Sequence, residues 1–475
     1  MKAKKSEDLP EWYGEVVVEA GLAGYAPIKG FIYLLPYGYE IWEQIRIHLD
    51  RRFRETNHRN AFLPVLIPES LLRKEAEHFK GFTPEVFWVT MSGDDQLSER
   101  YAVRPTSETL FYATFGKSIK SWRELPVLVN FWNSALRAEI KSTKPFIRTS
   151  EFLWQEGHTI HATKEEADEE VMRMLAIYRE LIEEKLAIPV LAGYKSKLEK
   201  FVGALYTTTL EAVMPDGRVL QMATSHNLGQ NFTTAFEVRY LGPDGQMHYA
   251  WSTSWGLSWR VIGAVIMVHG DDRGLVLPPE IAPIQAVVIP IYYTDAGREV
   301  VLEKCRELVS RLRGAGVRTH LDDDPEHTPG WKFNEWELRG VPVRVEVGPR
   351  DVSERRVTLF RRDELKRTRV DESSLEAAVK GLLSEVQRNL FRKAQELLRS
   401  RLSEAKSLEE FARVLEERGG FVRATYCGSD ECETRIKDLT GATVRVIPFE
   451  REPLLSPCIV CGKEDGVTAY FGRAY

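Results

Sequence analysis

Apolar positions in the first 280 residues repeat with two different periods. One set recurs every four residues within 36–59 and predicts a single long amphipathic helix that begins near Pro36; its members are Ile41, Ile45, Leu49 and Phe53. Residues 165–186 predict a second helix. Shorter apolar runs predict strands at 61–68, 86–91, 101–105, 127–134 and 151–162. Short strands among such helices predict an antiparallel sheet with helices packed on it.

The pattern changes after a proline-rich segment at 278–283. A helical run at 299–316 then alternates with strand-like runs, which predicts an α/β unit with a largely parallel sheet; these runs are 286–293, 317–321 and 341–347. A long helical run over 373–402 leads into a last unit. We therefore divide the chain into four parts: 1–282, 283–383, a linker helix at 384–405, and 406–475.

Composition limits what these units can be. The 475 residues are 43% apolar and 28% charged, as in ordinary globular proteins and unlike disordered or fibrous chains. Lysine and arginine total 65 against 70 acidic residues, so the net charge is −5, which excludes a wholly basic nucleic-acid coat but allows a local basic face. The first residues lack an apolar signal segment, and no run of about 18 apolar residues exists, so we expect neither secretion nor a membrane span.

Four of the five cysteines have the spacing of metal ligands. Cys427 and Cys432 form C-x4-C, and Cys458 and Cys461 form C-x2-C after an intervening 25 residues. Two such pairs in one small unit predict a tetrahedral structural Zn²⁺ in a reducing cytoplasm. A redox dithiol at the second pair is the alternative, while Cys305 is expected to be a buried thiol on a helix.

The segment with the most chemical information is 130–161. Two predicted strands flank a loop, and Arg137 and Glu139 share one face of the first strand because strand side chains alternate. The second strand places four residues on one face: Phe152, Trp154, Glu156 and His158. The loop adds Lys141, Lys144 and Arg148. These groups offer an arginine fork for phosphate, a flat ring for a base and a carboxylate for an ammonium. A solvated hairpin with ordinary ion pairs is the alternative.

Three further segments carry weaker signals. RPTSE at 104–108 suits a ligand site or a helix N-cap. Residues 221–232 are rich in side-chain donors and acceptors, as a ligand-facing segment would be. In 252–260, Gly256 permits close approach of the backbone to a ligand and Arg260 opens an apolar run.

Together these segments resemble the class II aminoacyl-tRNA synthetases, and closely the prolyl-tRNA synthetases of the archaeal and eukaryotic type. The long helix followed by AFLPVL, with Pro64, resembles motif 1; residues 136–158 resemble motif 2, and WGLSWR at 255–260 resembles motif 3. RPTSE and TSHNLGQNF match the proline-specific form. One departure is Trp259, which stands where motif 3 usually has Glu before its Arg, a change that the prolyl branch tolerates.

The resemblance implies an α+β fold. A class II antiparallel sheet with helices would occupy the N-terminal part, followed by an α/β anticodon-binding domain and a small α/β zinc-binding C-terminal domain. It also implies a homodimer built on motif 1. Bacterial-type relatives carry a large editing domain between motifs 2 and 3, and here only residues 159–220 lie there. We therefore expect no separate editing domain.

The same resemblance assigns roles to residues by matched position. Arg137 would be the catalytic group that holds the α-phosphate and the amino-acid carboxylate. The implied ATP contacts are Arg137, Arg148, Phe152, Gln221, Thr224, Ser258 and Arg260, with Phe152 and Arg260 enclosing the adenine. The implied proline contacts are Thr106, Glu108, Arg137, Trp154, Glu156, His158, Phe201 and His226. Glu337 and Arg344 would read anticodon bases, although an ion-paired strand edge explains them nearly as well.

The implied activity is ligation of L-proline to tRNA(Pro) with ATP and Mg²⁺ in the cytoplasm, with no DNA partner. Glu211 is a possible Mg²⁺ ligand. A synthetase-like RNA-binding regulator without charging activity is the alternative; such paralogues usually lose the ATP-binding arginines, which are all present here. A sister enzyme for Thr, His or Gly, and a zinc-dependent nucleic-acid regulator, account for fewer of the motifs.

Overall fold

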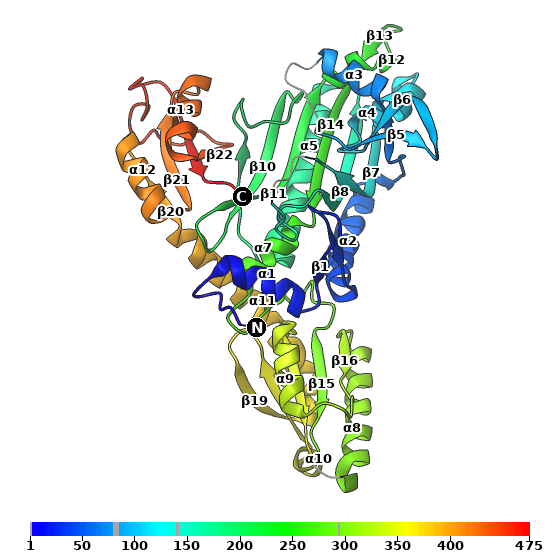
Figure 1. The fold of residues 1–475 in the computed structure, drawn as a ribbon, viewed down its shortest axis with the longest axis vertical. Coiled ribbons are helices and arrows are strands. Elements are labelled where there is room, and N and C mark those ends of the chain that lie inside the picture. Colours follow the sequence, from blue (N-terminus) through cyan, green and yellow to red (C-terminus); the bar gives the residue numbers. More distant parts are fainter. Residues whose placement is uncertain (1, 79–84, 139–141, 293–294) are drawn as a thin grey trace.

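The computed structural model describes residues 2–78, 85–138, 142–292 and 295–475. Within them the largest sheet has eleven strands, antiparallel from β9 to β7, in this order: β20 (Leu402–Glu404), β21 (Phe421–Tyr426), β23 (Val467–Gly472), β22 (Thr443–Pro448), β9 (Leu191–Tyr194), β10 (Tyr206–Val213), β11 (Val219–Gly229), β14 (Trp251–Ser258), β8 (Glu151–His161), β7 (Val127–Leu136) and β3 (Arg59–Asn60). The predicted antiparallel sheet is therefore confirmed, and Figure 1 shows it continuing toward the C-terminal unit.

Two long helices, α2 (Pro36–Glu55) and α5 (Lys164–Glu180), pack on one face of this sheet. The apolar stripe predicted for the first helix is buried, each member at most 1% exposed. Tyr178 of α5 donates a hydrogen bond to Gln155 of β8. Gly157 permits the packing because a Cβ there would lie 2.1 Å from the Trp255 ring. The opposite sheet face, which carries the alternate side chains of β8, is left for a ligand.

The predicted boundaries shift at three places. Helix α2 ends at Glu55 instead of 59, and Asn57 adopts a positive φ of 67°, which suits the end of a helix. The predicted strand at 61–68 is observed only as β4 (Leu66–Pro68), since Pro64 has no N–H for a ladder. The helix predicted at 165–186 is α5 followed by a wider turn, η3 (Leu181–Lys185).

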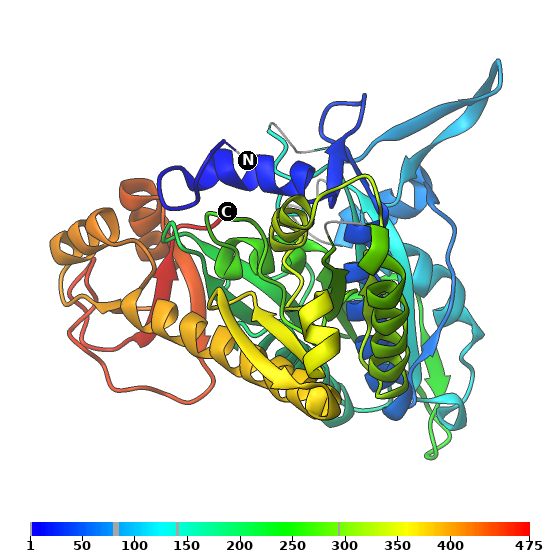
Figure 2. The same cartoon turned by 90° about the horizontal axis from the view of Figure 1, so that it is seen from below.

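Smaller elements surround the large sheet. They are the helices α1 (Leu9–Glu19), α3 (Glu69–His78), α4 (Glu108–Phe111), α6 (Asn231–Ala235) and α7 (Arg260–His269), the turns η1 (Tyr112–Gly116) and η2 (Trp122–Glu124), and the strands β1 (Ala23–Tyr25), β2 (Ile32–Leu34), β5 (Trp88–Ser92), β6 (Asp95–Val103), β12 (Arg239–Leu241) and β13 (Met247–Tyr249). Figure 2 shows the β5–β6 hairpin projecting from the body. None of the helices in the described ranges is both long and apolar enough to cross a membrane.

The α/β unit holds a five-stranded sheet in the order β16 (Thr319–Leu321), β15 (Ala286–Pro290), β17 (Val343–Val347), β18 (Arg356–Arg361) and β19 (Lys366–Asp371). Its described helices are α8 (Asp295–Gly314), α9 (Pro329–Leu338) and α10 (Pro349–Glu354). The first three strands are parallel as predicted, whereas β18 and β19 form an antiparallel hairpin that was not predicted. Strand β19 is an edge strand rich in charge, so it lacks an apolar alternation.

A single helix, α11 (Leu375–Ser400), passes the predicted boundary at 383. Val379 lies in the core of the α/β unit, and Leu390 contacts a small cluster with Ala187 and Val276 of the N-terminal unit. The linker helix is therefore packed along both units. The domain boundaries themselves stay a prediction.

The C-terminal unit contains α12 (Leu408–Glu417), α13 (Asp430–Thr440) and the strands β20 to β23. Its strand β22 pairs with β9 of the N-terminal unit, with Ile447 opposite Tyr194 and Pro448 opposite Gly193. Gly193 allows this close approach, because a Cβ there would lie 2.2 Å from the carbonyl oxygen of Ile447. One sheet is thus shared by two units that are far apart in the sequence.

Candidate active site

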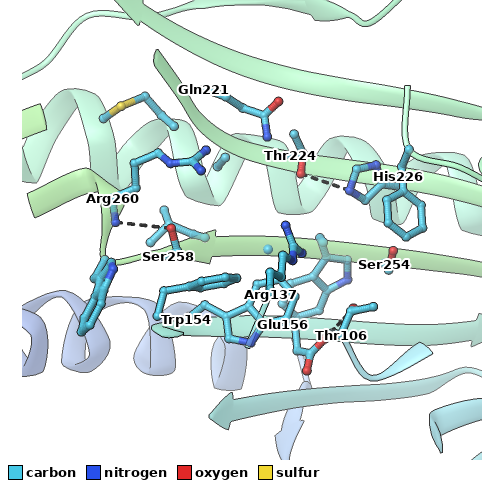
Figure 3. A pocket seen from close by; sticks show the side chains of 18 of the residues that line it. Thr106, Arg137, Trp154, Glu156, Gln221, Thr224, His226, Ser254, Ser258 and Arg260 are labelled. Carbon is cyan, nitrogen blue, oxygen red and sulfur yellow. Dashed lines mark hydrogen bonds between the residues drawn. The ribbon is translucent and has the colours of Figure 1, made fainter. Parts of the chain in front are cut away.

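A cavity of about 540 Å³ lies on the face of the sheet opposite α5. All fourteen residues that the sequence assigned to ATP and proline line this one cavity, together with others. They come from β8, β11, β14, the β7–β8 loop, the starts of α4 and α7, and the segments before α4 and β10. Figure 3 shows Gln221, Thr224 and His226 along one strand, facing the same space as Trp154 and Glu156 of another.

Glu156 is the most heavily bonded group at one end of the cavity. It accepts hydrogen bonds from Ser107, both N–H (3.0 Å) and hydroxyl, and from Thr106 (3.1 Å), Asn133 (3.0 Å) and His158 (3.2 Å). Burial would raise the pKa of Glu156, but these hydrogen bonds and the His158 charge lower it to about 2. A carboxylate held ionised in a buried site is suited to bind an ammonium group.

The pKa values of the two histidines at this end shift in opposite directions. Burial lowers the pKa of His158, but its hydrogen bond to Glu156 and the charges of Glu108 and Glu156 raise it above the ordinary value. Burial, together with the charge on His158, lowers the pKa of His226 to about 3. His226 is therefore neutral near pH 7, and its ring lies 4.9 Å from that of Phe201 between centroids. Apolar ring faces and a carboxylate together suit a small cyclic amine.

Arginines dominate the other end of the cavity. The Arg137 guanidinium lies 5.2 Å from the Phe152 ring centroid. Burial lowers the pKa of Arg260 to about 10, and the nearby positive charge of Arg137 acts in the same direction. Arg148 lines the same part of the cavity. Three cations gathered beside an aromatic ring suit a nucleotide with its phosphates.

Several lining residues were not predicted, and two of them are Tyr475 and Ser254. Tyr475 borders the cavity, donates a hydrogen bond to Asp216, and has Lys144 above its ring at 4.4 Å. Ser254 lies directly between His158 and His226 in the register of the sheet. Alternation along β14 was the available signal for Ser254, whereas Tyr475 reaches the site from a distant part of the chain.

Lys144 and Glu211, both named from the sequence, do not line the described cavity. Glu139 and Lys141 lie outside the described residues. Glu211, considered for Mg²⁺, is completely buried, and its two oxygens accept hydrogen bonds from Lys195 at 2.6 Å and Arg445 at 2.9 Å. In this arrangement both carboxylate oxygens already accept hydrogen bonds from positively charged side chains.

The four cysteines of the C-terminal unit come together as predicted. Their sulfur atoms lie within 4.8 Å of one another, and the Sγ atoms of Cys427 and Cys461 are 3.7 Å apart. All four are free thiols. Four thiolates around zinc at ~2.3 Å stand ~3.8 Å from one another in a tetrahedron, so the donor set fits this ion. A dithiol at Cys458 and Cys461 alone would leave the other pair without a role.

Glu337 and Arg344 lie together inside the α/β unit. The Arg344 guanidinium donates to Glu337 at 3.0 Å and to Glu346 at 2.8 Å, and it lies 4.1 Å from the Phe333 ring centroid. Arg273 of the N-terminal unit also binds Glu337, at 2.8 Å. The Glu337 side chain is only 9% exposed and that of Arg344 only 2%, so in this structure the two form a buried ion pair. A role in reading bases stays a prediction.

Models of three protein families match the chain. They are described as "tRNA synthetase class II core domain (G, H, P, S and T)" over residues 87–269, "Anticodon binding domain" over 285–382, and "Prolyl-tRNA synthetase, C-terminal" over 408–475. Together they confirm the predicted fold class, in which a class II core precedes an anticodon-binding domain and a C-terminal domain.

Curated relatives match over nearly their whole length. The Proline--tRNA ligase of Cenarchaeum symbiosum is 54% identical over 473 residues, which cover 100% of this chain and 99% of the relative. That of Alkaliphilus oremlandii is 51% identical over 468 residues (98% and 96%), and that of Rubrobacter xylanophilus is 51% identical over 472 residues (99% and 98%).

Proposed function

The chain belongs to the prolyl-tRNA synthetases of class II, and from this premise we propose that it activates L-proline with ATP and transfers the prolyl group to tRNA(Pro). The observation that carries the proposal is the single cavity, in which an ionised carboxylate and apolar walls at one end face three arginines at the other. A regulator that only bound RNA would have no need of this combination.

In the first step the proline carboxylate attacks the α-phosphorus of ATP, and pyrophosphate leaves. Arg137 lies between the two ends of the cavity, so its fork is placed to contact both the carboxylate and the α-phosphate. Mg²⁺ carried with ATP supplies further charge neutralisation. Arg148 and Arg260 add to the positive field, and Phe152 offers a ring face to the adenine. Catalysis is thus by positioning and by charge stabilisation, without an enzyme nucleophile.

Proline itself is bound at the Glu156 end. The secondary ammonium of proline is matched by Glu156, Thr106 and Glu108, while Trp154 and Phe201 provide walls for the ring. In the second step a ribose hydroxyl of the terminal adenosine of tRNA(Pro) attacks the prolyl carbonyl, and AMP leaves.

Exchange of labelled pyrophosphate into ATP, measured with each amino acid in turn, tests the function. We expect exchange that depends on proline. Equal or greater exchange with Thr, His or Gly would overturn the specificity, and no exchange with any amino acid in folded protein would favour the RNA-binding regulator.

A second expected result concerns alanine. Residues 159–220 are all described. They form the end of β8, β9, β10 and the start of β11 in the large sheet, together with α5 and η3, with no separate domain among them. A proline-sized pocket excludes a smaller side chain by only about 1–3 kcal/mol. We expect some alanyl-adenylate to form, and pre-made alanyl-tRNA(Pro) to survive incubation with the enzyme as long as it does in buffer. Faster hydrolysis would reveal an editing site.

We also propose a homodimer, the commonest closed assembly. The α2 stripe is covered by the chain itself, so its side chains are not available to a partner. Exposed apolar side chains lie beside it instead: Ile47 is 61%, Phe62 81% and Val65 43% exposed. In the described residues β3 is also the outermost strand of the large sheet. These features support an isologous contact through the α2–β4 region.

Light scattering checks this proposal. The wild type should have twice the mass of one chain at micromolar concentration, and Phe62→Asp should reduce the dimer because it places a charge in the contact. Val300→Asp, at a 58% exposed position of the α/β unit, is the matched control and should leave the mass unchanged. A monomeric wild type would contradict the assembly.

The proposal also includes the metal, the cellular location and the anticodon contacts. The cysteine cluster would hold one structural Zn²⁺, and its free thiols suit a reducing cytoplasm. We propose that Glu337 and Arg344 contact the anticodon, exchanging their mutual hydrogen bonds for those of base edges. We assign no DNA or membrane partner.

A further inference from the structure

Glu211 of β10 is a completely buried carboxylate surrounded by donors. Its Oε1 accepts hydrogen bonds from Lys195 at 2.6 Å and from Thr209 at 2.9 Å. Arg445 binds it with a fork: Nη2 lies 2.9 Å and Nε 3.1 Å from Oε2. Burial would raise the pKa of Glu211, but the charges of Lys195 and Arg445 lower it. The carboxylate is therefore a fixed negative charge, and both of its oxygens accept hydrogen bonds.

Arg445 belongs to β22 of the C-terminal unit, not to the catalytic unit. Its side chain is only 7% exposed, and it crosses the β22–β9 junction to reach Glu211. It also lies 3.5 Å from Glu199, which lines the catalytic cavity. The C-terminal unit thus places one guanidinium between two carboxylates of the catalytic unit.

Glu211 supports the strand that carries the proposed nucleotide contacts. It stands directly opposite Gln221 in the β10–β11 register, where the pairing shifts because β11 holds an extra residue, Met222. Bulges of this kind re-aim side chains beside active sites. Here Gln221, Met222 and Thr224 all line the cavity. The partners of Glu211 therefore support the bulge.

Glu211 also acts electrostatically on Arg260. Burial and the charge of Arg137 lower the pKa of Arg260, whereas the negative charge of Glu211 raises it. Within the described residues no ion pair joins Glu211 to Arg260, since Lys195 and Arg445 occupy the carboxylate. Without Arg445, Glu211 would become an incompletely paired buried charge, and Arg260 would be the next cation available to it.

We propose that Arg445 is a positioning residue of the nucleotide site that the C-terminal unit supplies. By binding the Glu211 carboxylate, Arg445 holds the β10–β11 bulge in place and leaves the Arg260 guanidinium free to bind ATP. This inference rests on the proposed ATP-dependent activation, and it makes the C-terminal unit a working part of the synthetic site.

Proline-dependent ATP–pyrophosphate exchange by the full-length enzyme tests the proposal. Arg445→Gln should raise KM for ATP about tenfold, because a charged hydrogen-bonded pair is lost, while KM for proline changes less than about twofold. Arg445→Lys retains the charge without the fork and should fall between. Adding Glu211→Gln to Arg445→Gln should bring KM for ATP back toward the wild-type value, since the freed charge that captures Arg260 is gone.

Arg423→Gln is the matched control. Arg423 lies on β21 of the same sheet and pairs with Glu404 and Glu452, so its loss should leave both KM values unchanged. The proposal is overturned if folded, zinc-loaded Arg445→Gln or Arg445→Lys has the wild-type KM for ATP. It is overturned equally if both KM values rise together, if Arg423→Gln has the same effect, or if Glu211→Gln gives no rescue. Failure of the proposed function itself would appear separately, as absence of exchange in the wild type.

Discussion

Arg137→Ala is expected to lose about 10²–10³-fold in kcat for proline-dependent exchange, the cost of removing a preorganised charge from a developing negative centre. The guanidinium lies 5.2 Å from the Phe152 ring and 5.9 Å from the Trp154 ring, between the proposed nucleotide and proline ends. No other described arginine of the cavity lies over both rings. Arg137→Lys should recover only part of the rate, because an ammonium cannot make a two-pronged contact.

The fold of these variants must be checked separately. Arg137 is on the cavity wall, so its removal should leave the unfolding temperature within a few degrees of the wild type, about the change expected for a substitution outside the core. Arg350→Ala, at an exposed helix position of the α/β unit, should leave both rate and stability unchanged. A near-normal exchange rate in Arg137→Ala would remove this residue from its assigned role.

The second large effect is expected from Cys458→Ser. One zinc per chain should be found in freshly purified, reduced wild type, and little or none in the variant, because one of four ligands is lost. A structural zinc contributes folding free energy, so residues 406–475 should become sensitive to protease. Cys305→Ser is the control, since Cys305 is a buried thiol outside the cluster and should not alter the zinc content.

Exchange activity should fall along with zinc, at least as far as in Arg445→Gln. The sequence alone indicates a separate C-terminal unit. The pairing of β22 with β9 and the reach of Arg445 to Glu211 change that expectation. Absence of zinc from the wild type, or full activity in zinc-free Cys458→Ser, would contradict this account.

The sequence predicted the site better than its surroundings. Strand alternation placed Phe152, Trp154, Glu156 and His158 on one face, and the structure puts all four in the cavity. Period and motif spacing are local properties, and so is the four-residue repeat of α2. The resemblance then joined segments that no local pattern could bring together.

What the sequence did not predict depends on non-local contacts. Arg445 and Glu211 are 234 positions apart, and nothing near either residue indicates the other. The β18–β19 hairpin was missed because its outer strand carries charges in place of an apolar alternation. Glu337 and Arg344 were expected either to read bases or to form ion pairs at a strand edge. The structure shows the ion pairs, but it also buries both side chains, and burial of paired charges cannot be read from residue type.

The shared sheet has a consequence for how the protein is made. Strand β9 is complete as soon as the first half of the chain has been synthesised, but its neighbour β22 emerges only near the end. Until then β9 presents an unpaired strand edge, and unpaired edges recruit other chains. Pairing across such a sequence separation is also slow, because a long loop must close first. Premature termination before β22 should therefore yield aggregates, and refolding from denaturant should improve at low protein concentration.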